Sequence, residues 1–216
     1  ETINKPKPMV EIGGIPILIH IMRHLSLYGV NKFVIALGYK GEVIKEYFSN
    51  LNRNLSDIKI KFPESKIIYL SEDIPKWEVT LIDTGLATMT GGRLKRVIPH
   101  LEGNNFIFTY GDGLSDINIE KLINFHEESN FLATVSAVHP MARFGALKME
   151  GNIVKEFQEK PLDNANWING GFFILNKKVS EYLLGENDIW ESQPLEQIAK
   201  DGHLQAFKHE GFWHSM

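Results

Sequence analysis

The sequence contains no cysteine among its 216 residues, which excludes a disulfide framework and any thiolate metal site. No apolar run approaches the roughly 20 residues that a helix needs to cross a bilayer, and the first residues lack an apolar signal-peptide core. These absences favour a cytoplasmic protein without a membrane partner. The formal net charge of -4 gives no overall attraction to nucleic acid. Any anionic ligand must therefore be met by local lysines and arginines.

The composition is that of an ordinary globular protein. Hydrophobic residues make up 43% and charged residues 23% of the chain, both within the usual range. A chain of 216 residues is long enough to bury a sizeable core as one unit. It contains no internal repeat and no low-complexity linker, so we expect a single domain over residues 1–216.

Helical patterns alternate with short apolar runs along most of the chain. This alternation predicts an α/β layered fold with right-handed crossovers. Residues 52–78 are less regular and predict an excursion from the main sheet, and a hairpin is expected with its turn at 150–152. Strands are expected at 32–38, 79–85, 106–108, 132–138, 167–175 and 204–207, and helices at 16–28, 43–51, 94–101, 117–128 and 195–200.

A lone carboxylate, Asp112, stands where the apolar run Phe106–Phe108 gives way to Gly111-Asp112-Gly113. In open α/β sheets, ligands bind outside the carboxyl ends of the strands. An acid at that edge is suited to hold a divalent cation against a phosphate, and the flanking glycines leave room for a ligand. The alternative is an aspartate in an ordinary Gly-rich turn.

Two lysines near the start of the chain are candidates for contacts with phosphate. Pro6 and Pro8 favour extended backbone at Lys5 and Lys7, which suits a lysine for one phosphate oxygen. A basic, Pro-rich terminal tail is the alternative.

The segment Thr88–Arg93 directly precedes the helical pattern at 94–101. Its amides are expected near a helix N-terminus, where they can meet a phosphate or a base edge. Arg93 adds a planar guanidinium. The alternative is a simple capped helix start.

Two later segments carry further candidates. Glu159 and Lys160 end the second hairpin strand and are fixed by Pro161, so they are suited to a polyol hydroxyl and a phosphate. An exposed ion pair is the alternative. Asn169, Gly170 and Gly171 precede an apolar strand, which indicates either a β-bulge or close approach of a ligand.

Taken in order, six short segments resemble the sugar-phosphate nucleotidyltransferases, and most closely their glucose-1-phosphate cytidylyltransferase branch. The resemblance covers nearly the whole chain, and six ordered matches are far more specific than any one. The segments are KPKPM at 5–9, MTGGR at 89–93, YGDG at 110–113, FG at 144–145, FQEKP at 157–161 and INGGF at 168–172.

The resemblance implies a Rossmann-like mixed, mostly parallel sheet flanked by helices, with a β-hairpin region that binds the sugar. It implies that Lys7 contacts the triphosphate and that Asp112 is catalytic and binds Mg²⁺. It also assigns two groups of binding residues. The nucleotide side comprises Thr88, Thr90, Gly91, Gly92, Arg93 and Gly111, and the sugar-phosphate side comprises Gly145, Glu159, Lys160, Asn169 and Gly170.

The implied reaction joins CTP and glucose 1-phosphate to give CDP-glucose and pyrophosphate, and the family suggests a homo-oligomer. Family members carry a Gly-rich loop at a position before Glu1 and a second metal-binding aspartate at a position after Met216, so we expect flanking residues. Three alternatives stay open. They are a relative that uses another nucleotide or hexose phosphate, a non-catalytic sugar-nucleotide-binding domain, and a more distant glycosyltransferase, although Asp112-Gly113-Leu114 lacks that enzyme's Asp-x-Asp motif.

Overall fold

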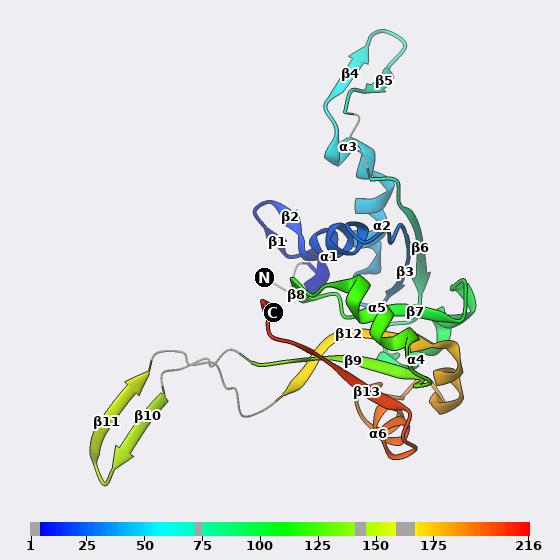
Figure 1. Cartoon of the computed structure of the whole chain (residues 1–216). Coiled ribbons are helices and arrows are strands. Elements are labelled where there is room, and N and C mark those ends of the chain that lie inside the picture. Colours follow the sequence, from blue (N-terminus) through cyan, green and yellow to red (C-terminus); the bar gives the residue numbers. More distant parts are fainter. Residues whose placement is uncertain (1–4, 72–74, 141–145, 159–166) are drawn as a thin grey trace.

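The computed structural model describes residues 5–71, 75–140, 146–158 and 167–216 (Figure 1). The helices are α1 Ile17–Ser26, α2 Gly41–Ser49, α3 Leu51–Leu55, α4 Thr90–Val97, α5 Ile119–Glu127 and α6 Gln193–Lys200, with 3-10 turns η1 Lys7–Met9, η2 Ile98–His100 and η3 Lys177–Tyr182. The strands are β1 Glu11–Ile12, β2 Ile15–Pro16, β3 Lys32–Leu37, β4 Ile58–Lys61, β5 Lys66–Tyr69, β6 Glu78–Asp83, β7 Asn105–Thr109, β8 Gly113–Ser115, β9 Ala133–Val138, β10 Ala146–Glu150, β11 Ile153–Gln158, β12 Ile168–Asn176, β13 Leu204–His209 and β14 Trp213–Ser215.

A four-stranded sheet in the order β13-β9-β12-β7 forms the centre of the fold. Strand β13 is parallel to β9, whereas β12 is antiparallel to both of its neighbours. Strands β7, β9 and β13 therefore run in one direction and β12 alone in this sheet runs in the other. Strands β3 and β6 form a separate parallel pair. The predicted Rossmann-like mixed α/β fold, with most core strands parallel, is confirmed.

Strand β12 shows why the sheet has helices on both faces. Its side chains alternate, as the two-residue period of a strand requires. Phe173 packs in a cluster with residues of α4 and α6, whereas Phe172 packs in a cluster with residues of α1 and α5. Both phenylalanines are fully buried. The result is a three-layer arrangement, and Trp190, also fully buried, fills the layer beneath α4.

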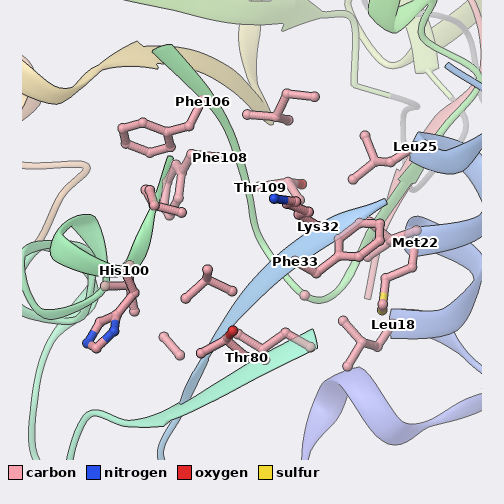
Figure 2. Close-up of a pocket in the computed structure, with 18 of the residues that line it drawn as sticks. Leu18, Met22, Leu25, Lys32, Phe33, Thr80, His100, Phe106, Phe108 and Thr109 are labelled. Atoms are coloured by element: carbon pink, nitrogen blue, oxygen red, sulfur yellow. The ribbon is translucent and has the colours of Figure 1, made fainter. Parts of the chain in front are cut away.

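A largely apolar cavity of about 470 Å³ lies between β3 and β7 (Figure 2). Leu18 and Met22 of α1 line it together with Phe33 of β3 and Phe108 of β7. Within the described ranges, β3 pairs with β6 alone and β7 with β12 alone. The backbone edges of β3 and β7 that face the cavity therefore have no strand partner in this part of the chain. The cavity extends to the carboxyl end of β7, where its lining includes Pro8, Thr90, Arg93, Tyr110 and Gly111.

Two hairpins extend away from the layered body (Figure 1). Strands β4 and β5, joined to the body through α3, form a projecting arm (residues 57–70) and confirm the predicted excursion at 52–78. Strands β10 and β11 confirm the predicted hairpin with its turn at 150–152. The role of that hairpin in sugar binding stays a prediction. No helix in the described ranges has both the length and the apolar character to cross a bilayer.

The N-terminus of α4 differs from the sequence-based expectation. The helix begins at Thr90 rather than at residue 94, so Gly91 and Gly92 lie in its first turn. Both glycines are buried, and the segment 186–188 packs directly on them. A Cβ atom at Gly91 would lie 2.8 Å from the carbonyl oxygen of Asp188, and one at Gly92 would lie 2.5 Å from that of Glu186. These two glycines therefore permit a backbone-to-backbone contact.

We predict that Gly92→Ala destabilises the protein although alanine is the better helix former. The new methyl group collides with backbone, which cannot rotate away as a side chain can, and overpacking of this kind costs about 1–3 kcal/mol. Gly185→Ala is the matched control, because a Cβ there has nothing within 4 Å. Urea denaturation measures the free energy of unfolding for both. Equal stability of the two variants would contradict the packing role of Gly92.

Candidate active site

Lys7 and Asp112 lie together at the carboxyl end of β7. The Nζ atom of Lys7 is 3.5 Å from Oδ2 of Asp112, although the two residues are 105 positions apart. Gly111 makes this approach possible, because a Cβ there would lie only 2.8 Å from Cγ of Pro8. The side chain of Asp112 is 28% exposed and that of Lys7 is 56% exposed. Both charges can therefore reach a ligand.

The backbone at Lys7 is not extended as the flanking prolines predicted. Lys7 opens the 3-10 turn η1, in which the amide of Met9 donates to the carbonyl oxygen of Pro6 at 2.8 Å. Met9 is buried against residues of α1, which anchors the turn. Pro8 sits at the start of this turn, where its fixed φ is compatible with helical geometry and its missing N–H is not needed. The burial of Met9 outweighed the local preference for extended backbone.

The segment that follows β13 fixes the position of Asp112. Strand β14 pairs antiparallel with β8, with Ser215 opposite Gly113. The amide of Met216 then donates to the carbonyl oxygen of Asp112 at 3.1 Å. The backbone of the aspartate is therefore held while its carboxylate stays accessible. The second metal-binding aspartate, expected at a position after Met216, stays a prediction.

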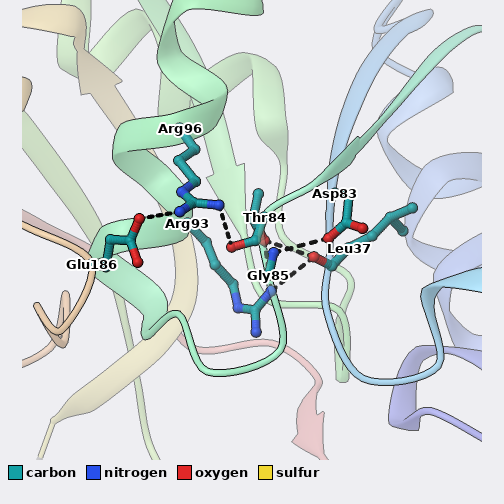
Figure 3. Close-up of polar contacts among 7 residues, drawn as sticks. All are labelled: Leu37, Asp83, Thr84, Gly85, Arg93, Arg96 and Glu186. Atoms are coloured by element: carbon teal, nitrogen blue, oxygen red, sulfur yellow. Dashed lines mark hydrogen bonds and ion pairs between the residues drawn. The ribbon is translucent and has the colours of Figure 1, made fainter.

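Arg93 joins α4 to the carboxyl ends of β3 and β6 (Figure 3). One guanidinium nitrogen, Nη1, donates to the carbonyl oxygen of Leu37 at 2.9 Å and to Oγ1 of Thr84 at 2.6 Å. The guanidinium occupies the space beside Gly38, where a Cβ would overlap it. Partial burial lowers the pKa of Arg93, and the nearby Asp83 carboxylate opposes that effect. The group stays charged, because an arginine pKa lies far above neutral pH.

A second arginine of α4, Arg96, also contacts the turn that follows β6. Nη1 of Arg96 donates to the carbonyl oxygen of Thr84 at 3.0 Å, and its other terminal nitrogen pairs with the carboxylate of Glu186 (Figure 3). The amide of Gly85 donates to Oδ1 of Asp83 at 2.9 Å. The turn after β6 is therefore held by side chains of α4 and by its own aspartate.

The amides at the N-terminus of α4 already have acceptors within the chain. Those of Gly91 and Gly92 donate to the carbonyl oxygen of Asp188 at 2.8 and 3.3 Å, and that of Met89 donates to Glu186 at 2.9 Å. The glycine amides that were expected to meet a ligand are thus hydrogen-bonded within the chain. The contacts of Thr90, Gly91 and Gly92 with a nucleotide stay predictions. Thr88 is buried in the turn before α4, with 6% of its surface exposed, and its nucleotide contact also stays a prediction.

A chain of polar side chains crosses the edge of the cavity. The amide Nδ2 of Asn169 donates to the hydroxyl of Tyr110 at 3.2 Å, and the carboxylate of Glu191 lies near that hydroxyl. Oγ1 of Thr90 donates to Oε2 of Glu191 at 2.7 Å and accepts the amide of Trp190 at 2.8 Å. Burial, followed by the nearby Glu191 carboxylate, raises the pKa of Tyr110. The phenol is therefore a neutral donor at any physiological pH.

Tyr110 and Glu191 were not among the residues singled out from the sequence. Tyr110 directly precedes the Gly111-Asp112 pair, so its position in the motif was a signal for it. Glu191 lies in the stretch between η3 and α6, where no motif marks it. Only the long-range contact with Thr90 identifies it.

The glycines at the start of β12 are explained by contacts within the protein. The pairing of β12 with β9 shifts register between Asn169 and Phe173, which is the bulge that the sequence left open. A Cβ at Gly170 would lie 2.7 Å from Oγ of Ser136, and Gly171 has a φ of +78°. Nε1 of Trp213 donates to the carbonyl oxygen of Gly170 at 2.7 Å. Contacts of Asn169 and Gly170 with a sugar phosphate stay predictions.

The remaining predicted sugar-phosphate residues, Gly145, Glu159 and Lys160, lie outside the described residues. In the part of the chain that is described, no group of three or more His, Asp or Glu side chains is placed to hold a metal ion. Asp112 is the candidate ligand. Mg²⁺ in phosphoryl-transfer sites is usually held by one or two carboxylates together with substrate phosphates. A single accessible carboxylate beside a lysine fits that pattern.

Comparison with known proteins gives this arrangement its context. The model of the family described as "Nucleotidyl transferase" matches residues 2–213. The chain belongs to this family. It is 48% identical over 217 aligned positions to the glucose-1-phosphate cytidylyltransferase of Salmonella typhi, covering 100% of this chain and 84% of the relative.

Two further comparisons agree. The probable glucose-1-phosphate cytidylyltransferase of Bacillus subtilis strain 168 is 40% identical over 209 positions, covering 96% of this chain and 82% of that protein. The crystal structure of HddC from Yersinia pseudotuberculosis superposes with a TM-score of 0.69 at 24% identity, covering 97% of this chain and 84% of that one. The second comparison supports the fold alone.

We predict that Arg93→Lys lowers the free energy of unfolding by about 1–3 kcal/mol. A lysine carries one compact charge and cannot reproduce the guanidinium contacts, which leaves partly buried acceptors unsatisfied. Arg53→Lys is the control, because Arg53 is exposed on α3 and surface changes cost within about 0.5 kcal/mol. Chemical denaturation of both variants provides the measurement. A loss of stability no larger than that of Arg53→Lys would argue that the Arg93 hydrogen bonds do not hold α4 to the strand ends.

Proposed function

We propose that the protein transfers the cytidylyl group of CTP to glucose 1-phosphate, giving CDP-glucose and pyrophosphate. The observation that carries this proposal is the pairing of Lys7 with Asp112 at 3.5 Å, at the carboxyl end of a sheet strand. A cation and a carboxylate at that edge are what a nucleoside triphosphate with its metal ion requires. The names of the relatives from Salmonella typhi and Bacillus subtilis support CTP and glucose 1-phosphate as the substrates.

The chemistry needs no general base. The attacking oxygen belongs to the phosphate of glucose 1-phosphate and is already anionic, so the reaction depends on bringing two anions together. Asp112 would hold Mg²⁺, which would supply charge neutralisation at the phosphates. Lys7, with its accessible ammonium group, stabilises negative charge on the α-phosphate as it develops. The bonds balance, because an O–P bond to the sugar phosphate forms as the bond to pyrophosphate breaks.

The same geometry suits a relative that uses UTP, dTTP or GTP, and substrate comparison distinguishes these cases. A non-catalytic sugar-nucleotide-binding domain is separated from an enzyme by turnover.

The predicted cytoplasmic location stays a prediction. For the predicted homo-oligomer, the exposed apolar side chains of Phe62 and Leu70 on the projecting arm, 78% and 55% exposed, are a supporting feature.

We predict that the purified protein releases pyrophosphate from CTP with glucose 1-phosphate and Mg²⁺ at least tenfold faster than from UTP, dTTP or GTP. Pyrophosphate release measured with each nucleotide in parallel tests this. A clear preference for another nucleotide would replace CTP in the proposal. Binding of nucleotide without any turnover would favour the non-catalytic domain.

We also predict that Asp112→Asn and Lys7→Ala each lower kcat by about 100-fold or more. Removal of one electrostatic stabiliser of the reacting centre typically costs 10²–10³ in rate. Asp57→Asn on the projecting arm is the control, since Asp57 is exposed and remote from the cavity. Retention of full activity by both site variants would reject the assignment of these residues.

A further inference from the structure

The segment 210–216 crosses the carboxyl edge of the sheet from β13 to β8 (Figure 1). Strand β13 forms one edge of the four-stranded sheet, whereas β8 is the next element after β7 at the other edge. On the way, Nε1 of Trp213 donates to the carbonyl oxygen of Gly170 in β12. At its far end, the amide of Met216 donates to the carbonyl oxygen of Asp112 at 3.1 Å. The segment therefore connects the outer strand of the sheet to the candidate metal ligand.

His209, the last residue of β13, holds the start of this segment. Its Nε2 atom lies 2.9 Å from Oδ1 of Asp116, which directly follows β8, and 3.3 Å from the carbonyl oxygen of Phe212. Both neighbours are acceptors, so Nε2 carries a proton and donates it. The side chain of His209 is only 12% exposed, whereas that of Asp116 is 62% exposed. The imidazole is thus enclosed by protein, which restricts the orientation of the ring.

Gly211 makes this contact possible. A Cβ atom at Gly211 would overlap Oδ1 of Asp116 and would lie 2.6 Å from Cε1 of His209. The two side chains therefore lie directly against the backbone of the turn between β13 and β14. The space that a larger residue would fill at position 211 is occupied by the His209–Asp116 pair.

The backbone next to Asp116 is held by the core and not by His209. Ile117, the following residue, is fully buried. Nε2 of His24 in α1 is hydrogen-bonded to the carbonyl oxygen of Ile117 at 2.8 Å. Through Asp116, His209 thus attaches the segment 210–216 to a part of the chain that already has a fixed position.

We propose that His209, acting through Asp116, positions Asp112 for the metal ion of the reaction. This inference rests on the proposed function and extends it. The His209–Asp116 pair keeps β14 in place on β8, and β14 brings the amide of Met216 to the carbonyl oxygen of Asp112. A metal ligand whose own backbone is held needs less reorganisation when it binds a cation. His209 is a positioning residue, because it acts on Asp112 through β14.

The test is His209→Ala, with Mn²⁺ as the metal probe. Electron paramagnetic resonance measures protein-bound Mn²⁺ in the presence of CTP and without glucose 1-phosphate, with Mn²⁺ and CTP alone as the reference. Pyrophosphate release measures the Mg²⁺ concentration that gives half of the maximal rate. Loss of a residue that supports a metal ligand commonly costs about 10–100-fold in metal affinity or activity. We therefore expect Mn²⁺ affinity to fall about tenfold and the Mg²⁺ requirement to rise by a similar factor.

Three further variants make the test specific. His203→Ala is the matched control, because His203 directly precedes the opposite end of β13. His209→Gln keeps an N–H donor near the position of Nε2, so we expect it to restore most of the Mn²⁺ affinity. Asp116→Ala removes an exposed side chain and tests the same pair from its other partner. The double variant of His209→Ala and Asp116→Ala is expected to lose no more affinity than either single change, because residues that act as a pair are not additive.

Unchanged Mn²⁺ affinity in His209→Ala and Asp116→Ala overturns the proposal. Lower thermal stability with an unchanged Mg²⁺ requirement also overturns it, because that pattern indicates a role in the fold alone. Additive losses in the double variant, or a His209→Gln variant no better than His209→Ala, contradict the hydrogen-bonded pair. The two hypotheses fail separately. Wild-type protein that binds Mn²⁺ with CTP but releases no pyrophosphate contradicts the proposed function, while weaker Mn²⁺ binding in His209→Ala still supports the role of His209.

Discussion

The hydrogen bonds of the Arg93 guanidinium are the constraint on which the site depends. They connect the last residue of β3, Leu37, and the residue after β6, Thr84, to helix α4. Charge-assisted hydrogen bonds of this kind are stronger than neutral ones, and partial burial protects them from water. The position of α4 in turn determines where segment 186–191 rests. The position of Glu191 therefore depends on Arg93 at the carboxyl ends of β3 and β6.

The charged side chains at the carboxyl edge of the sheet lie on different elements. Lys7 and Asp112 lie where phosphates and a metal ion are expected, whereas the exposed carboxylate Glu191 accepts a hydrogen bond from Thr90 of α4. Electrostatic attraction to a polyphosphate does not depend on the base. A lysine at the phosphates therefore does not by itself distinguish one nucleotide base from another.

Much of the fold followed from local pattern. The strands at 32–38, 79–85 and 132–138, the projecting arm and the hairpin at 150–152 were all predicted, because apolar runs and turn residues determine them over a few positions. The proximity of Lys7 and Asp112 followed from the family motifs. Because the two residues are 105 positions apart, local sequence pattern gave no independent indication that they lie close together.

The errors share one physical cause, which is contact between distant segments. The helix after Thr88–Arg93 was expected from residue 94, but it begins at Thr90, and backbone of 186–188 packs on Gly91 and Gly92 in its first turn. Lys7 was expected in extended backbone, but burial of Met9 favoured a 3-10 turn. Glu191 carried no local signal, because its hydrogen-bond partner Thr90 lies 101 positions away in the sequence.

The contact between α4 and segment 186–191 also affects when the site can form. The first turn of α4 has no side-chain cap, and the amides of Met89, Gly91 and Gly92 donate to carbonyl groups of Glu186 and Asp188. Thr90 and Trp190, which bond each other, are 100 positions apart. Closing a loop of that length must precede any stabilisation gained from it, which makes such contacts late events in folding. During synthesis from the N-terminus, the part of the candidate site around Thr90 therefore remains unformed until the segment 186–191 has been made.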